Sequence, residues 1–256
     1  MGEAMKTTTE IRNRFNSEGL VYCKSFKTRF EIDDILTNLA RVISEVIPEM
    51  PSDHVFYEDK SNPATLKQLQ QLQVHDQYFG NLMTDGPFRR LAESLLGTQV
   101  VCQNMQYFNK PPGIGLATPA HQDGYYFKLE PCEAVTMWMA LEPVDEENGC
   151  VRYVPGSNHD GMRPHGPTGT LGFSQGITDF PTEQDAASEI AFPAQPGDLL
   201  AHHALTIHRA EGNSSQTRSR RALGLIYYSV DAKADAMAWE QYQAKLKSEL
   251  TDGNKI

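Results

Sequence analysis

Between residues 100 and 230 the sequence breaks into many short apolar segments, which Gly, Pro and Asn separate. It predicts strands at 100–108, 133–142, 150–154, 188–192, 198–202, 205–209 and 221–230. Residues 133–142 alternate little with polar residues, so this strand is expected to be buried on both faces. Asn148-Gly149 predicts a hairpin, and residues 156–187 are expected to form a long loop without secondary structure of its own. Short strands joined by turns favour an antiparallel double sheet, a jelly roll or cupin-like barrel.

Helical patterns flank this region on both sides. Thr28 and Glu31 form a capping box ahead of apolar residues at helical spacing. Further helices are predicted at 8–17, 64–79, from Asp85 to Gly97, and at 234–250, where Trp239, Tyr242 and Leu246 share one side; a short strand is predicted at 19–22. We therefore expect a mainly β fold with flanking α-helices, with the N-terminal helices packed outside a double-stranded β-helix. One domain is expected over 1–256, with a mostly helical flank (1–98), a jelly-roll core (99–230) and a C-terminal helix (231–256).

The charge balance limits the classes of partner. The chain has 256 residues and a formal net charge of −10, which argues against nucleic acid or an anionic membrane as the main partner. The cysteines Cys23, Cys102, Cys132 and Cys150 are widely spaced, which is typical of free thiols in a reducing compartment. The N-terminus is polar, and no apolar run approaches a membrane span. We expect a cytoplasmic monomer or homodimer that acts on a small molecule.

His121 and Asp123 are the first candidates for chemistry. If residues 118–127 form a strand, these two side chains point to the same face. An imidazole and a carboxylate side by side make two-thirds of a metal site, although a His-x-Asp tripeptide alone is weak evidence. The candidates for a third ligand are His202, His203 and His208, which lie in one segment. Two histidines and one carboxylate on one face of the ion suit non-haem Fe(II).

An arginine pair indicates what else this site binds. His208 ends an apolar segment, and Arg220 and Arg221 open the next predicted strand, so we expect them to meet across a hairpin. Since an arginine is no metal ligand but holds a carboxylate bidentately, it suits a dicarboxylate that also chelates the iron. 2-Oxoglutarate fits that description. Strand alternation allows only one of the two arginines to point inward.

A set of motifs then resembles one known family. These are Asn109-Lys110-Pro111-Pro112, His121-Gln122-Asp123, Trp138, Asn148-Gly149-Cys150, Val154-Pro155-Gly156-Ser157-Asn158-His159, Gly197-Asp198, His208, Asn213 and Arg220-Arg221-Ala222. Their order and spacing, with the opening Phe15–Val21, resemble the phytanoyl-CoA dioxygenase (PhyH) family over most of the chain.

The resemblance implies an Fe(II)- and 2-oxoglutarate-dependent dioxygenase on a double-stranded β-helix. Such an enzyme would use O2, with ascorbate as a reductant, to hydroxylate an aliphatic C–H and release succinate and CO2. It implies His121, Asp123 and His208 as iron ligands, with no catalytic residue beyond them, and Arg220, Gln122, Trp138 and Gln106 at the co-substrate. One departure concerns Arg209-Ala210, where some members have Gly-Ser with a serine on the co-substrate.

The alternatives are a cupin-like hydrolase or isomerase, which needs the metal ligands but no arginine, and a non-catalytic binding protein on the same fold. Five residues are candidates for the substrate pocket: Tyr57, Lys110, Tyr125, Arg163 and His165. The 156–187 segment and the segment near Tyr57 are expected to cover that pocket. The substrate itself stays open between acyl-CoA esters and free small molecules.

Overall fold

Two antiparallel sheets form the centre of the protein. The computed structural model describes residues 8–170, 173–238 and 240–241. The larger sheet contains, in spatial order, β1 (Leu20–Cys23), β12 (Leu199–His203), β7 (Ala134–Ala140), β14 (Arg220–Ser229), β4 (Val100–Lys110), β3 (Leu66–Leu69) and β2 (Val55–Tyr57). The smaller sheet contains β11 (Ile190–Phe192), β8 (Val151–Tyr153), β13 (His208–Ala210) and β5 (Thr118–His121). Two strand pairs, β9 (His165–Thr170) with β10 (Phe173–Ile177) and β6 (Leu129–Glu130) with β15 (Lys233–Ala234), complete the described strands.

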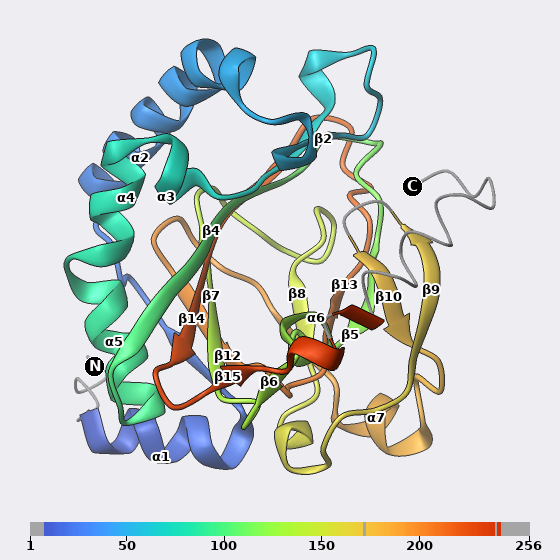
Figure 1. Cartoon of the computed structure of the whole chain (residues 1–256). Coiled ribbons are helices and arrows are strands. Elements are labelled where there is room, and N and C mark those ends of the chain that lie inside the picture. Colours follow the sequence, from blue (N-terminus) through green and yellow to red (C-terminus); the bar gives the residue numbers. More distant parts are fainter. Residues whose placement is uncertain (1–7, 171–172, 239, 242–256) are drawn as a thin grey trace, which may run out of the picture.

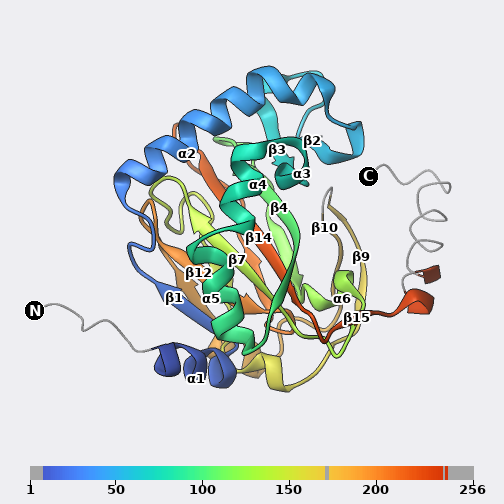
Figure 2. The ribbon, with the colours of Figure 1, turned by 60° about the vertical axis from the view of Figure 1, so that its left-hand side comes forward.

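Helices cover the outer face of the larger sheet (Figures 1 and 2). The α-helices are α1 (Thr8–Glu18), α2 (Arg29–Arg41), α3 (Leu72–His75), α4 (Gln77–Thr84), α5 (Pro87–Leu96), α6 (Gly124–Phe127) and α7 (Glu183–Ser188). Short turns of other helix types lie at Val42–Val46, Ile47–Glu49, Ser52–His54, Pro63–Thr65 and Ser157–His159. The predicted capping box at the start of α2 is confirmed, since Thr28 and Glu31 exchange both hydrogen bonds. The predicted class, an antiparallel double sheet with N-terminal helices outside, is also confirmed.

Side-chain alternation explains why the larger sheet has one face toward the helices and one toward the interior. On β14, Leu223, Leu225 and Tyr227 pack in the core that the helices cover, whereas Ala222 belongs to a second, inner cluster. On β7 the alternate residues divide in the same way, and every residue of that strand is buried, as predicted. The inner face of this sheet and the smaller sheet enclose the space described below.

Two predicted helix boundaries differ from the structure. The segment 64–79 is not one helix, because residues 66–69 form β3 and pair with β4. Leu66 and Leu69 are three residues apart, which mimics a helical pattern, but the edge of β4 offers unpaired backbone groups that β3 satisfies. The next helix, α5, begins at Pro87 instead of at Asp85, and it ends at Gly97 as predicted.

Connections between the sheets were the harder part to predict. Asn148-Gly149 does not close a hairpin, because β7 pairs with β12 and β14 whereas β8 pairs with β11 and β13. The Asn148 side chain instead donates to the carbonyls of Pro143 and Ser219 and fixes a crossover between the sheets. The prediction of a long loop at 156–187 was wrong, because this segment carries β9, β10 and most of α7. The strands β9 and β10 contain Gly and Pro and lack apolar alternation, so they gave no strand signal.

The predicted C-terminal helix falls largely outside the described residues. Residues 236–238 are helical, whereas Trp239, Tyr242 and Leu246 lie outside the described part of the chain. Within the described residues, no helix has both the length and the apolar character that crossing a bilayer requires.

Gly197→Ala is expected to destabilise the fold strongly. Gly197 has φ +91° in the turn that leads into β12, and an added Cβ would overlap the backbone carbonyl of Lys27. We expect the free energy of unfolding to fall by at least about 2 kcal/mol in chemical denaturation, because backbone strain and overlap add. Gly156→Ala is the matched control, since Gly156 has φ +83° with open space around its Cβ position. Equal losses in the two variants would show that the overlap contributes nothing.

Candidate metal centre and co-substrate cavity

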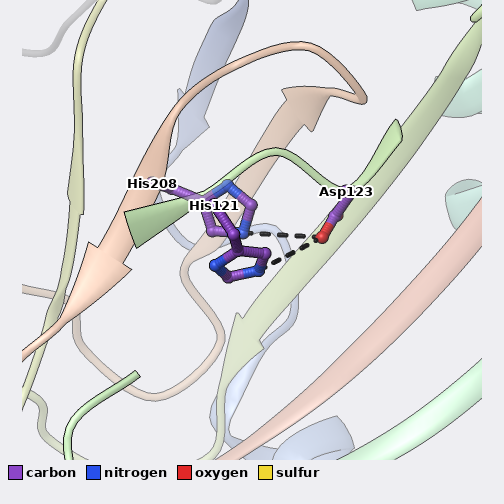
Figure 3. Close-up of side chains that lie close together, drawn as sticks. All are labelled: His121, Asp123 and His208. Atoms are coloured by element: carbon purple, nitrogen blue, oxygen red, sulfur yellow. Dashed lines mark ion pairs between the residues drawn. The ribbon is translucent and has the colours of Figure 1, made fainter. Parts of the chain in front are cut away.

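His121, Asp123 and His208 come together at the interior edge of the smaller sheet (Figure 3). His121 ends β5 and His208 begins β13, and these two residues are direct cross-strand partners. Their Nε2 atoms lie 3.4 and 3.7 Å from Oδ1 of Asp123, and one donor atom from each residue lies within 4.8 Å of the others. The predicted grouping of three ligand-type side chains is therefore present.

Asp123 reaches the cluster by a different route from the one predicted. The strand ends at His121, and Asp123 has helical dihedral angles (φ −57°, ψ −34°) at the start of α6. Strand alternation therefore does not aim this carboxylate. The turn between β5 and α6 does so instead, because it brings the chain back over the inner face of β7.

Backbone hydrogen bonds fix both imidazoles. Nδ1 of His121 donates to the carbonyl of Pro119 at 2.8 Å, and Nδ1 of His208 donates to the carbonyl of Thr206 at 3.0 Å. The Nε2 lone pairs therefore point toward Asp123, an arrangement typical of metal-binding histidines. Burial, together with the neighbouring His121 and His202, holds the pKa of His208 well below its usual range. A neutral imidazole is the form that can coordinate a metal ion.

The second oxygen of Asp123 is held from the larger sheet. Oδ2 accepts hydrogen bonds from Oγ1 of Thr136 at 2.5 Å and from Nε2 of His202 at 3.1 Å. The hydroxyl of Tyr153 then donates to Nδ1 of His202 at 3.0 Å. Burial alone would raise the pKa of Asp123, but the nearby His208, His121 and His202 hold that pKa well below its usual range. Asp123 is therefore ionised, with Oδ1 facing the two ligand-type imidazoles.

These donors fit a divalent transition metal. Two imidazole nitrogens and one carboxylate oxygen form the facial set that non-haem Fe(II) takes, which leaves further coordination positions open. His202, one of the three candidates for the third ligand, donates a hydrogen bond to the carboxylate and does not belong to the cluster of three. Thr136 and Tyr153 were not predicted. The available signal for Thr136 was its place as the one hydroxyl residue in an otherwise apolar strand.

Arg220 lies buried in the same interior. Arg220 is only 5% exposed to solvent, and its guanidinium carbon lies 5.4 Å from the centre of the Trp138 ring. Among the described residues Arg220 has no carboxylate partner, and its Nε is buried without a hydrogen bond. Arg221 points to the other face and pairs with Glu142 at 3.0 Å. Burial lowers the pKa of Arg220 to about 10, and a bound carboxylate would raise it again.

One cavity joins the metal cluster to Arg220. It has a volume of about 400 Å³, and its lining includes the three ligand-type residues, Arg220, Trp138, Gln106 and Lys110. Arg220 does not face His208 across a hairpin as predicted, because β13 and β14 belong to different sheets. The two strands instead approach from opposite walls of this cavity.

The comparisons with known proteins agree with this geometry. The family model described as phytanoyl-CoA dioxygenase (PhyH) matches residues 15–222, which is most of the chain. The protein belongs to the PhyH family. With the His-Asp-His cluster in its cavity, it is an iron- and 2-oxoglutarate-dependent oxygenase.

Individual relatives are distant from this PhyH protein. A phytanoyl-CoA dioxygenase of Arabidopsis thaliana is 26% identical, and the match covers 88% of this chain and 90% of that protein. The human peroxisomal phytanoyl-CoA dioxygenase is 27% identical over 56% of this chain, and the match spans only 43% of that protein. The solved structure of the epimerase SnoN with Fe3+, alpha ketoglutarate and nogalamycin RO superposes with a TM-score of 0.69 at 22% identity, covering 89% of this chain and 85% of that chain. This last likeness concerns the fold.

Gln122 lies outside the cavity lining of this PhyH chain, although it was predicted to lie near the co-substrate. Its side chain is fully buried and donates to the carbonyls of Gly161 and Leu205 at 2.8 and 2.7 Å. Its Oε1 accepts a hydrogen bond from the backbone of Arg163. Gln122 therefore ties the segment after β8 to the site, because its position in the turn after His121 directs it away from the metal.

Four of the five residues predicted for the substrate pocket also lie outside the lining. Arg163 is paired with Asp179 and Asp185, and its pKa is raised although burial opposes this. His165 stacks on Tyr125 with ring centres 4.3 Å apart. Tyr57 lies at the end of β2, outside the cavity. Arg163 is thus neutralised by neighbouring carboxylates, and the rings of His165 and Tyr125 stack on each other.

Lys110 is the pocket candidate that the structure does place in the cavity. It is buried beside Arg220, its cross-strand partner, and its Nζ donates to the carbonyl of Leu116 and to Thr118. Burial first, and then the charges of Arg220 and Lys67, lower its pKa well below the usual value. Lys67 was not predicted, and it lies in the same lining, paired with Glu58 at 3.3 Å. The cavity therefore has one cationic end.

Thr136→Val is expected to weaken iron binding about 10- to 100-fold, because Asp123 loses the hydroxyl that orients it. The shape of the strand is retained, so circular dichroism and the unfolding midpoint should change little. Thr217→Val is the matched control, since Thr217 is exposed. Iron affinity would be measured by anaerobic Fe(II) titration against a competing chelator. Unchanged affinity would show that the Thr136–Asp123 hydrogen bond does not orient a ligand.

Proposed function

We propose that this protein is an Fe(II)- and 2-oxoglutarate-dependent dioxygenase that hydroxylates an aliphatic C–H of a small molecule and releases succinate and CO2. His121, Asp123 and His208 hold the iron, and Arg220 binds the distal carboxylate of 2-oxoglutarate. The observation that carries this proposal is the buried, carboxylate-free guanidinium of Arg220 in the same cavity as the three metal donors.

The alternative of a hydrolase or isomerase explains the donors but not the arginine. Burying a guanidinium without a counter-ion is unfavourable, so a protein gains nothing from it unless an anion binds there. A bidentate guanidinium at one end of a cavity and an open metal at the other match the two ends of a chelating dicarboxylate. Neither a zinc-bound water nor a non-catalytic binding fold requires that second group.

The residues of the chain position and shield the reactants. Bound iron and 2-oxoglutarate supply the activation of O2, while the protein contributes placement and exclusion of water. Trp138 lies against Arg220 and forms a wall of the cavity that would hold 2-oxoglutarate. Gln106 lines the next position of that wall, and Lys110 lies beside Arg220 as its cross-strand partner. Ala210 also lines the cavity. The co-substrate would therefore be held without the serine contact that the family resemblance implies for some members.

An anaerobic titration tests the proposal directly. Adding Fe(II) and 2-oxoglutarate to the folded protein should produce a weak visible charge-transfer band, because the keto acid chelates the metal. His121→Ala should abolish this band, whereas His159→Ala, an exposed histidine, should retain it. In air and with ascorbate as reductant, substrate should couple O2 uptake to succinate formation. A folded, iron-loaded protein without the band would exclude 2-oxoglutarate as co-substrate.

The cysteines support a cellular setting for this chemistry. Cys102, Cys132 and Cys150 form no disulfide in the described part of the chain. Free thiols persist in reducing compartments, which supports our proposal of a cytoplasmic protein.

A further inference from the structure

We propose that the end of the cavity opposite Arg220 is a subsite for a neutral, hydroxyl-bearing ring, such as a sugar or cyclitol unit of the substrate. This inference rests on the proposed function, because it assigns the substrate class of the same site. It favours a polyhydroxylated substrate over a fatty acyl chain or a highly charged thioester.

The register of the larger sheet orders the cavity from end to end. Lys110 pairs with Arg220 at one end, and Asn104 pairs with Ile226 six residues further along the strands, about 20 Å away. Ile226 is also the cross-strand partner of Thr136, which holds Asp123. Thr136, and with it the Asp123 carboxylate, therefore lies nearer the Asn104 end of the strands than Arg220 does. 2-Oxoglutarate would occupy the space from the metal toward Arg220, so the substrate approaches from the Asn104 side.

That end of the cavity is lined by carboxamides. The lining includes Gln70, Gln71, Gln103 and Asn104. Apart from Asp123 in the metal cluster, the charged lining residues lie elsewhere: Lys67 and Glu58 pair with each other beside Lys110, and Arg209 pairs with Glu189 and Glu211. Beyond the metal cluster, a ligand at the Asn104 end therefore meets polar groups without net charge.

These carboxamides retain hydrogen-bonding capacity. Oδ1 of Asn104 accepts from the backbone of Gln71 at 2.9 Å and holds that residue in the left-handed region (φ +58°). Gln70 makes no side-chain hydrogen bond among the described residues, and Oε1 of Gln68, in the adjoining wall, is buried without a partner. A side-chain amide has both a hydrogen-bond donor and an acceptor, and a hydroxyl group can bond to either one. An acyl chain would leave these groups desolvated and unpaired, which is unfavourable.

Aromatic and apolar side chains complete the subsite. Ile226, Tyr228 and Phe127 line the same end, and the rings of Phe127 and Tyr228 lie 5.0 Å apart. Apolar walls of this kind pack against the C–H faces of a ring while the carboxamides meet its hydroxyls at the edge. Among the described residues that line this end, none is a lysine or arginine that could pair with the phosphates of a coenzyme A ester. The combination thus fits a neutral ring with several hydroxyls.

Ligand binding to the iron-loaded, 2-oxoglutarate-bound protein under nitrogen tests this proposal. The probes are methyl glycosides and myo-inositol on one side and palmitoyl-CoA on the other, with binding followed by calorimetry and by perturbation of the charge-transfer band. We expect the best neutral probe to bind more tightly than palmitoyl-CoA. Asn104→Leu should weaken that binding about tenfold, as expected for one unmade hydrogen bond.

Two further variants make the outcome decisive. Gln70→Leu removes a side chain with no internal hydrogen bond, so it should weaken binding without disturbing the fold even if Asn104→Leu fails to fold. Gln77→Leu is the matched control, since Gln77 is exposed on α4, and it should bind like the wild type. Palmitoyl-CoA binding best, or no neutral probe binding more tightly to wild type than to the Gln70 variant, overturns the proposal. Loss of the band in the wild type would instead overturn the proposed function.

Discussion

Asp123→Ala is expected to abolish succinate formation and to weaken Fe(II) binding by more than about 100-fold. Loss of a residue that merely orients a ligand typically lowers metal affinity 10- to 100-fold, and loss of a ligand should exceed that. In this protein the substitution removes the single carboxylate among the three ligand-type residues. It also removes the acceptor of the hydrogen bonds from Thr136 and His202.

The measurements for Asp123 separate ligand loss from misfolding. Circular dichroism should show a folded protein, while anaerobic Fe(II) titration and succinate analysis report the two losses. Asp53→Ala, an exposed aspartate near β2, is the control and should retain both properties. Iron binding close to that of the wild type in a folded Asp123 variant would mean that the cluster is not the metal site.

The three donor residues could be predicted from the sequence, although for a partly mistaken reason. The prediction placed His121 and Asp123 on one face of a single strand, but the strand ends at His121. Asp123 joins the cluster through a turn, which a period of two cannot describe. His121 and His208 come together because they are register partners, a long-range contact that no local pattern contains. The sequence grouped them because the family resemblance implied both as ligands.

The residues that support the donors could not be predicted in the same way. Thr136 and His202 face Asp123 because β7 and β12 are neighbours in the larger sheet, and this pairing joins segments far apart in sequence. Gln122 shows the opposite case, since it lies between two donors yet points away from them. Local spacing indicates which face a strand residue takes, but contacts across sheets depend on the complete fold.

The same limit explains the differences in the fold. Helices with caps and apolar faces, such as α2, were predicted well, because their signals are local. β3 was mistaken for a helix because four residues carry too little periodicity, and its pairing with β4 decides its conformation. The choice between Arg220 and Arg221 needed the structure for the same reason. Only the direction of β14 within the sheet tells which arginine faces the cavity.

Arg220→Gln is expected to raise the KM for 2-oxoglutarate about 100-fold or more, with a smaller effect on kcat at saturation. Truncating one partner of a buried charge pair costs several kcal/mol of binding free energy. Since each 1.4 kcal/mol corresponds to a tenfold change in affinity, the expected loss of affinity is about 100-fold or more. The same substitution should leave the free energy of unfolding unchanged or higher, because it removes a buried guanidinium without a carboxylate partner. If Arg220 instead stabilised the fold, the substitution would lower the free energy of unfolding.

Arg221→Gln distinguishes the two arginines on one strand. Arg221 is partly exposed and pairs with Glu142, so its loss should leave the KM for 2-oxoglutarate near the wild-type value. Initial rates of succinate formation at varied 2-oxoglutarate, together with denaturant unfolding of both variants, measure the pair of effects. An equal rise in KM for both variants would point to general disruption of β14. A normal KM in the Arg220 variant would leave the buried guanidinium without its proposed anion, because a carboxylate bound there must lose affinity when that charge is removed.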